Sequence, residues 1–211
     1  LFTGKGLKLG GSSAIYEDNN SYFGDLSAII TENLPFWADF SSAPSQETAL
    51  MSEWETKMDA IVEETIHENI TSLVGVPSWM LLLLNRVLEK TGKDTILEVW
   101  PNLEVYFHGG VNFNPYREQY KKLIPKADFK YYETYNASEG FFGLQDSNNS
   151  LELLLMLDYG IFYEFIPMDA YNGENSKTIP LSEVQKNVNY AMVITTNGGL
   201  WRYLIGDTVK F

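Results

Sequence analysis

Helical and strand-like spacings of apolar residues alternate along the first two thirds of this 211-residue chain. From Ser52 onward, apolar side chains recur every three or four residues, which predicts a helix that opens with a capping box of Ser52 and Glu55. The short apolar run "TSLVGVP" predicts a buried strand. Pro77 and Gly92 mark the two ends of a second helix, which we expect to be buried between layers because it is apolar on most of its circumference.

The alternation continues to the middle of the chain. "LEVYFHGG" predicts a strand that ends in two glycines, Pro115 begins a third helix, and "FKYYETY" predicts a strand that leads into the segment "YNASEGFFG". The first 30 residues are typical of a strand with tight turns followed by a polar loop. Their stretch "GKGLKLGG" lacks the terminal Gly-Lys-Ser/Thr of a phosphate loop, which argues against a nucleotide role there.

Beyond about Leu151 the pattern changes. The runs "LELLLM", "IFYEFIP" and "NYAMVITT" are strand-like, and Asn197-Gly198-Gly199 predicts a hairpin between the last two strands. The chain is therefore predicted to be an α/β protein in two parts. A mainly parallel sheet with flanking helices spans residues 1–145, and an antiparallel β-rich, barrel-like segment spans residues 146–211.

Composition and charge narrow the classes of function. The net charge of −13 disfavours nucleic acid and anionic membranes as partners, because both bind cationic surfaces. The chain has no cysteine for thiolate chemistry, and His67 and His108 are too few for a histidine-built metal site. The longest apolar run, "MLLLL", is too short for a bilayer, and no signal segment is recognisable, so we expect a cytoplasmic protein. Because the chain begins at Leu1 and ends in mid-strand, we expect an internal fragment of a longer protein.

Three strand-end features are candidates for a ligand site, since ligands of open α/β sheets bind beyond the carboxyl ends of the strands. Gly109-Gly110 offers bare backbone, and Tyr135 offers a flat ring on which a base can stack. Ser138 supplies a hydroxyl for a phosphate oxygen, and Glu139 supplies a carboxylate for magnesium. Gly206-Asp207 places a carboxylate in a tight turn, where it can accept both hydroxyls of a ribose. Taken singly, these features are more typical of a loop, a strand-to-helix cap and a hairpin corner.

In combination the segments resemble the auxin-responsive acyl-acid amido synthetase family (the Gretchen Hagen family), a branch of the adenylate-forming ligase superfamily. The resemblance runs along nearly the whole chain and rests on seven stretches: "NLPFWADF", "ALMSEWE", "GVPSWMLLLLNRVLEKTGK", "EVWPNLEVYFHGGVNFNPYREQYKKLIP", "YNASEGFFG", "FYEFIP" and "LWRYLIGD". The resemblance implies that a carboxylic acid is activated with ATP and Mg²⁺ to an acyl-adenylate, and that the acyl group is then passed to the amine of an amino acid.

The resemblance also implies a role for each matching residue. Tyr135 stacks on adenine, Ser138 contacts the α-phosphate, and Glu139 holds magnesium. Asp207 binds the ribose hydroxyls. Gly109, Gly110 and Val111 line the adenine and acyl side of the cleft. Val76, Pro77 and Met80 border the acid pocket, and Glu164 belongs to the far wall of the site.

Two departures from the family limit what the chain can do alone. The phosphate loop and the mobile C-terminal domain of the superfamily are not in this sequence, and Leu204 stands where plant members carry an arginine. We therefore expect the isolated chain to bind AMP weakly and not to turn over. Three alternatives remain: a non-catalytic nucleotide- or acyl-binding module, a purely structural domain, and an acyl-CoA-type ligase, which the signature "HGGVNFNPYREQ" disfavours.

Overall fold

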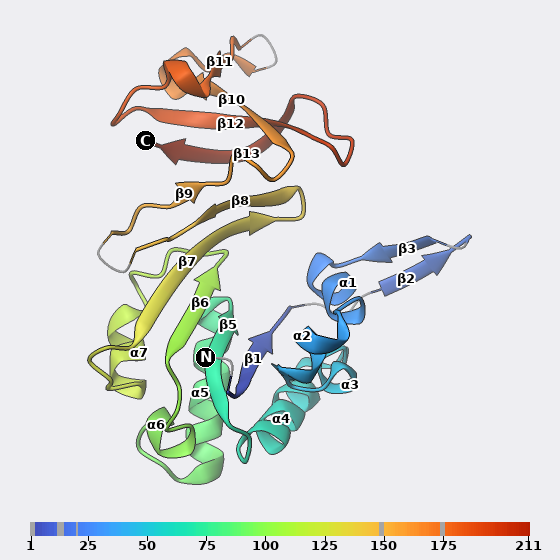
Figure 1. The fold of residues 1–211 in the computed structure, drawn as a ribbon, viewed down its shortest axis with the longest axis vertical. Helices are drawn as coiled ribbons and strands as arrows, with labels where there is room; N and C mark the ends of the chain where they lie inside the picture. The colour runs from blue at the N-terminus through green and yellow to red at the C-terminus, as the bar shows by residue number, and fades with distance from the viewer. Residues whose placement is uncertain (1–2, 12–14, 20, 148–149, 174–175) are drawn as a thin grey trace. The chain divides into compact units, whose positions relative to one another are not determined.

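The computed structural model describes residues 3–11, 15–19, 21–147, 150–173 and 176–211. Its contacts divide the chain into two compact units (Figure 1). Unit 1 comprises Leu1–Tyr135 and Leu144–Leu154, and unit 2 comprises Asn136–Gly143 and Leu155–Phe211. Each unit is described by itself.

A mainly parallel sheet organises unit 1, as the alternating pattern predicted. Within unit 1 its strand order is β4-β1-β5-β6-β7, and every pair is parallel. The strands of this part are β1 (Lys5–Leu9), β4 (Ser42–Ala43), β5 (Ile70–Gly75), β6 (Val105–Gly109) and β7 (Lys130–Ala137). Most of β8 (Gly140–Leu144) belongs to unit 2, and β9 (Leu154–Leu155) is divided between the two units. The predicted α/β class is therefore confirmed, although the run "LELLLM" contributes a strand of only two residues.

Helices connect the parallel strands, and two of them test the sequence predictions directly. Helix α5 begins with Pro77 at its first turn and ends at Gly92, which has a left-handed φ of 65°. The predicted capping box of α4 is wrong, because Glu53 caps the helix by accepting from the backbone N–H groups of Glu55 and Thr56. The helices of unit 1 are α1 (Leu26–Glu32), α2 (Phe36–Phe40), α3 (Gln46–Ala49), α4 (Trp54–Thr65), α5 (Pro77–Thr91), α6 (Ile96–Val99) and α7 (Arg117–Leu123).

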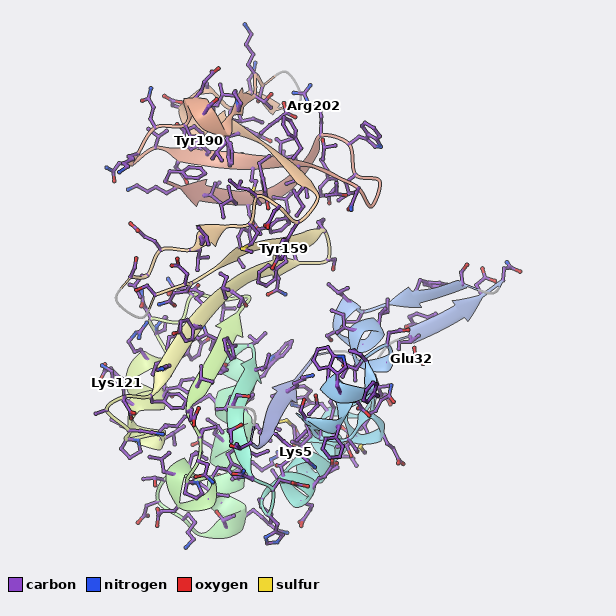
Figure 2. All side chains as sticks on the ribbon, viewed as in Figure 1. Lys5, Glu32, Lys121, Tyr159, Tyr190 and Arg202 are labelled. Carbon is purple, nitrogen blue, oxygen red and sulfur yellow. The ribbon has the colours of Figure 1, made fainter. Side chains whose placement is uncertain are left out.

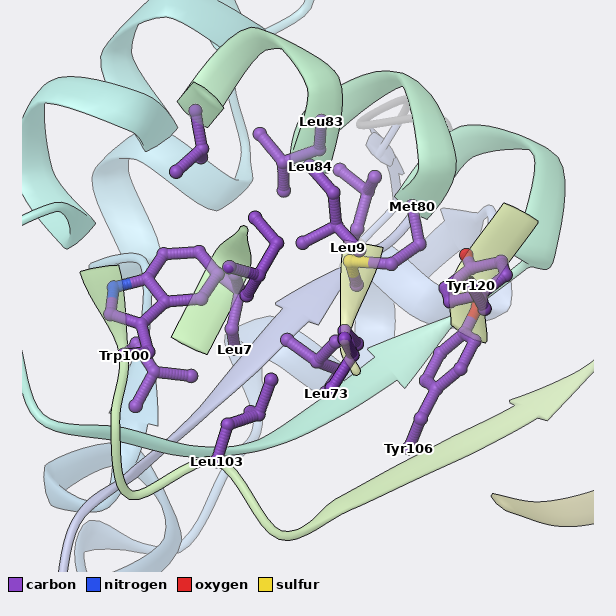
Figure 3. Packing of buried hydrophobic residues seen from close by; sticks show 14 of the residues in the cluster. Leu7, Leu9, Leu73, Met80, Leu83, Leu84, Trp100, Leu103, Tyr106 and Tyr120 are labelled. Carbon is purple, nitrogen blue, oxygen red and sulfur yellow. The ribbon is translucent and has the colours of Figure 1, made fainter. Parts of the chain in front are cut away.

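One hydrophobic core fills the space between the sheet and helices α4 and α5 (Figure 3). Leu7 and Leu73 project from the strands, and Met80, Leu83 and Leu84 project from α5, all with no exposed surface. Burial of this apolar area is the main source of stability for the unit. The prediction that α5 is buried between layers is wrong, since Leu82 on its outer face is 56% exposed.

The first 30 residues contain more regular structure than the sequence predicted. Strands β2 (Ile15–Asp18) and β3 (Ser21–Gly24) form an antiparallel hairpin, and α1 follows directly. The side chain of Asp25 caps α1 by accepting from the backbone N–H of Ser27 at 2.8 Å. The segment that was predicted to be a polar loop is therefore a hairpin and a helix.

Unit 2 is built on an antiparallel sheet with the order β11-β10-β12-β13. The predicted hairpin is confirmed, because β12 ends at Thr196 and the chain turns back through Asn197–Gly199, where the N–H of Gly199 donates to Thr196. The elements are β10 (Ile161–Pro167), η1 (Met168–Ala170), β11 (Ile179–Pro180), η3 (Leu181–Glu183), β12 (Asn189–Thr196) and β13 (Tyr203–Lys210). On one face, the rings of Phe165, Tyr190 and Phe211 meet edge to face.

Candidate functional site

The carboxyl end of β6 brings two backbone strands so close together that only glycine fits. Gly109 is paired with Thr134 on β7, and a Cβ atom added to Gly109 would lie 2.4 Å from the carbonyl oxygen of Thr134. Gly110 follows with φ of +80°, a left-handed conformation that favours glycine. An added Cβ at Gly110 would lie 3.5 Å from Cγ2 of Val76. The predicted residues Gly109, Gly110 and Val76 are therefore neighbours within unit 1.

The turn from β5 into α5 is held in place by two buried tyrosines. The hydroxyl of Tyr106 donates to the carbonyl of Gly75 at 2.9 Å, and the hydroxyl of Tyr120 donates to the carbonyl of Pro77 at 2.8 Å. Burial raises the pKa of both phenols, so both remain protonated donors at neutral pH. Their rings stack with centroids 5.0 Å apart and are labelled in Figure 3. The geometry next to the predicted acid pocket is thus fixed by the core.

The predicted substrate residues of unit 1 differ in exposure. Val111 is 40% exposed at the surface after Gly110, and Val76 is half-buried. Pro77 is buried, and Met80 has no exposed surface because it packs into the core. Tyr135 is half-buried near the end of β7. A contact between any of these side chains and an acid or a base stays a prediction.

His108 is buried directly before the two glycines, with 2% of its surface exposed. Its ring stacks on Phe113 with centroids 4.1 Å apart, and neither ring nitrogen has a hydrogen-bond partner among the residues that the structure describes. Burial, with a smaller effect from Arg117, lowers the pKa of His108 to about 4, so the ring is neutral at pH 7. This packing favours the structural role over contact with an acyl carboxylate.

The "YNASEG" segment is a strand, a two-residue turn and a second strand. β7 ends at Ala137, Ser138 and Glu139 form the turn, and β8 begins at Gly140. The alternative of a strand-to-helix cap is therefore wrong. Ser138 is exposed and Glu139 is half-buried. Both belong to unit 2, as does Phe142, whose carbonyl accepts from the N–H of Met156 at 2.9 Å.

Asp207 lies inside β13 and not in a tight turn, so the predicted hairpin corner at Gly206-Asp207 is wrong. Ala191 pairs with Thr208, but Val193 pairs with Leu204, so the register shifts and the intervening residues of β13 form a bulge. Gly206 has φ of +93°, which suits a glycine at such a bulge. Bulges of this kind change the direction of a side chain, and Asp207 is exposed.

Glu164 forms a hydrogen-bonded network within unit 2 that sequence reasoning missed. Its carboxylate accepts from Arg202 Nε at 3.1 Å and from the hydroxyl of Thr178 at 2.6 Å. Arg202, labelled in Figure 2, also donates to Thr178 at 2.9 Å. Arg202 stands 38 residues from Glu164 in the chain, and no local signal relates them. The network agrees with the packed-strand interpretation of Glu164, and its place on a site wall stays a prediction.

The acidic side chains of the described residues determine what kind of magnesium site the chain can offer. Among the described residues, no group of three or more His, Asp or Glu side chains could hold a metal ion. Magnesium, however, is commonly bound through one or two carboxylates together with substrate phosphates. A single carboxylate such as Glu139 fits a metal that arrives with a nucleotide. No helix within the described part of the chain has the length and apolarity needed to cross a membrane.

The fold of this chain is similar to folds seen in solved structures. The structure superimposes on "GH3.15 acyl acid amido synthetase" with a TM-score of 0.73 and 14% identity, over 99% of this chain and 46% of that one. It also superimposes on an open conformation of 2-hydroxyisobutyryl-CoA ligase with a TM-score of 0.62 and 13% identity, over 98% of this chain and 43% of that one. At these identities the likeness establishes the fold alone.

Sequence comparison identifies the family. The GH3 family N-terminal domain matches residues 2–129, and the GH3 family central domain matches residues 154–211. Because the first match alone covers more than half of the chain, the chain belongs to the GH3 family. It is 29% identical over 168 residues to "Indole-3-acetic acid-amido synthetase GH3.4" of Arabidopsis thaliana, which covers 74% of this chain but only 26% of that protein. The chain thus spans about a quarter of the length of this curated relative.

Proposed function

We propose that the protein containing this chain is an ATP-dependent acyl-acid amido synthetase. It activates a small carboxylic acid as an acyl-adenylate and then transfers the acyl group to the amine of an amino acid. The observation that carries the proposal is the match to both GH3 domains, together with relatives named as an indole-3-acetic acid-amido synthetase and a jasmonoyl–L-amino acid synthetase. A cytoplasmic location and a need for Mg²⁺ belong to the same proposal.

The residues of the "YNASEG" turn and of β13 are assigned to the nucleotide. A carboxylate oxygen of the acid attacks the α-phosphorus, the bond from that phosphorus to the bridging oxygen breaks, and pyrophosphate leaves. Since both reactants are anions, catalysis is mainly positioning and charge neutralisation. Tyr135 stacks on adenine, Ser138 donates to the α-phosphate, Glu139 holds Mg²⁺, and Asp207 accepts from the ribose hydroxyls. The exposed hydroxyl of Ser138 and the half-buried carboxylate of Glu139 support these assignments.

The ends of β5 and β6 are assigned to the acyl side. The left-handed Gly110 has no side chain at this strand end, so a flat ligand can lie against its backbone. Gly109, Gly110 and Val111 line the adenine and acyl side. Val76, Pro77 and Met80 line the acid pocket, and Glu164 lies at the far wall of the site.

Acid-dependent ATP–pyrophosphate exchange on the complete gene product tests the proposal. A panel of aryl and aliphatic carboxylic acids is screened with the wild type and with Glu139→Ala, and Glu152→Ala serves as an exposed matched control. We expect exchange with at least one acid, a loss of at least 100-fold in Glu139→Ala, and little change in the control. Exchange that survives in Glu139→Ala would contradict the magnesium role.

Product analysis separates the remaining alternatives. With the active acid, amide formation from an amino acid supports the amido synthetase, whereas thioester formation with coenzyme A indicates the acyl-CoA-type ligase whose fold is shared. Binding of AMP without exchange for any acid would indicate a non-catalytic nucleotide-binding module. A melting temperature that AMP does not change would indicate a structural domain.

A further inference from the structure

One short segment of unit 1 has a charge opposite to that of the chain as a whole. The chain carries 15 Lys and Arg against 28 Asp and Glu residues. Five of those 15 cations fall between residues 117 and 130, in the stretch "REQYKKLIPKADFK", which holds only two acidic residues. In a strongly acidic protein, such a reversal of sign attracts an anion locally.

The fold gathers most of these cations around one groove. Helix α7, the connection after it and the beginning of β7 enclose a cavity of about 640 Å³, a size typical of small-molecule sites. Four cations line it, and Asp128 is the one carboxylate among the described lining residues. The cationic lining residues are Arg117, Lys121, Lys126 and Lys130. Lys121 is labelled on α7 in Figure 2.

Arg117 is held rigidly at this groove. Its guanidinium carbon lies 5.0 Å from the ring centroid of Phe113 and 5.9 Å from that of Tyr131. Arg117 makes no ion pair among the residues that the structure describes. Burial raises the pKa of the nearby Glu133 carboxyl, and the positive charge of Arg117 partly offsets this rise. Because Arg117 forms no ion pair among the described residues, its guanidinium retains its capacity for a bidentate anion contact.

The lysines of the groove, like Arg117, are available to bind an anion. Lys121 pairs with Glu118 at 2.8 Å, but both side chains are exposed, so the pair adds little stability and can be exchanged. Lys126 donates to the carbonyl of Leu103 at 2.9 Å, which fixes its position and leaves its charge uncompensated. Lys130 is exposed and, within the described part of the chain, has no ion pair.

We propose that this groove binds a small polyphosphate, a ligand with two or more linked phosphate groups. A terminal phosphate carries a charge of about −1.5 to −2 at pH 7, so linked phosphates approach the charge of the lining, whereas one carboxylate leaves most of it uncompensated. Arginine forms bidentate contacts with phosphate oxygens, and lysines act as point charges around it. The buried side chains of Ile124 and Phe129 form an apolar wall beside the charges.

The groove is separate from the strand ends that we assign to the nucleotide. In the parallel pairing of β6 and β7, Val105 is opposite Lys130 and Gly109 is opposite Thr134. Lys130 therefore marks the amino end of these strands, while Gly109 marks their carboxyl end. The proposal goes beyond the amido synthetase assignment and can be tested without it.

Calorimetric titration of the complete gene product with inorganic tripolyphosphate is the test. The groove variant is Lys121→Gln with Lys130→Gln, since both residues are exposed and the protein should fold normally. Lys93→Gln with Lys122→Gln removes the same charge at exposed positions outside the groove lining. Ser138→Ala reports any binding at the proposed nucleotide site, because Ser138 is the residue assigned there to a phosphate. A hexaglutamate peptide is titrated in parallel at equal ionic strength.

We expect the groove variant to bind tripolyphosphate at least tenfold more weakly than the wild type. The charge-matched control and Ser138→Ala should stay within about twofold, and added salt should weaken binding. Equal affinity in the groove variant, or a loss confined to Ser138→Ala, would overturn the proposal. Tighter binding of hexaglutamate than of tripolyphosphate through the same lysines would replace it with an acidic protein partner. Failure of the exchange assay affects none of these readouts.

Discussion

Glycines at β6 and β13 are required for opposite reasons. At Gly109 on β6, an added Cβ would lie 2.4 Å from the carbonyl oxygen of Thr134 on the neighbouring strand. At Gly206 on β13, nothing lies within 4 Å of such an atom, but φ is +93°. The first glycine is required by the packing of a neighbouring backbone, and the second is required by its own backbone conformation.

This difference indicates what each region contributes. β6 lies in a sheet whose faces are packed, and its end is surrounded by buried side chains such as His108 and Tyr106. β13 is exposed along most of its length. Substitutions at the end of β6 should therefore change the stability of unit 1, whereas substitutions in β13 should change local geometry and ligand contacts.

Gly109→Ala should have the largest effect. The new Cβ can be accommodated only if β6 and β7 separate, and overpacking of this kind costs about 3 kcal/mol. Urea unfolding followed by tryptophan fluorescence measures the loss, because Trp100 is buried in unit 1. Gly198→Ala in the hairpin of unit 2 is the control, since its nearest contact would be 3.6 Å. Equal losses in the two variants would contradict the packing argument.

Acidification should destabilise unit 1 through His108. Its pKa is lowered to about 4 in the folded protein from an unfolded value of 6.5, so the unfolded state binds the proton more readily. Stability from this group is complete above pH 6.5 and falls as the pH drops toward 4, by up to about 3 kcal/mol. Neither of the two histidines of the chain lies in unit 2.

The measurement is the free energy of unfolding as a function of pH for the wild type and His108→Leu. The variant should lose most of the slope between pH 6.5 and 4, because leucine does not titrate. Carboxylates contribute to both curves and cancel in the difference. Identical slopes would mean that His108 is protonated equally in the folded and unfolded states.

Much of the fold could be predicted where glycine and proline mark the ends of elements. Helix α5, between Pro77 and Gly92, and the hairpin at Asn197–Gly199 were predicted with nearly correct bounds. The cap at Glu53 was missed, because a serine-glutamate pair satisfies the usual capping pattern one residue too early. Short elements such as α1 have too few residues for a periodic signal.

The candidate site was predictable in residue type but not in local geometry. The glycines after β6 were recognised from two adjacent letters, but the structure shows that Gly109 is required by the neighbouring backbone at Thr134, and a ligand at these glycines stays a prediction. The bulge at Asp207 and the contact of Arg202 with Glu164 depend on the register between strands, which no local pattern specifies. The ligand roles of the site residues stay predictions.

Gly206→Ala should reduce the free energy of unfolding by less than Gly109→Ala does. An alanine at φ of +93° costs about 1–2 kcal/mol through its own backbone, although the surrounding space is empty. Gly206→Asn is the matched variant, because asparagine adopts left-handed conformations more readily than alanine. The melting temperature should be highest for the wild type, lower for Gly206→Asn and lowest for Gly206→Ala. An alanine that is tolerated as well as asparagine would show that β13 shifts its register.

The smallest effect on stability, and the largest contrast with Gly109, is expected for Asp207→Asn. The side chain is exposed, so the free energy of unfolding should change by less than about 0.5 kcal/mol. Affinity for AMP should nevertheless fall at least tenfold, because hydrogen bonds to a charged group contribute about 1.5–3 kcal/mol. Calorimetric titration with AMP on the complete gene product measures this, with Thr208→Val as the neighbouring exposed control. A loss of affinity at unchanged stability would assign binding to β13, whereas unchanged affinity would remove Asp207 from the nucleotide site and leave the bulge as a purely structural feature.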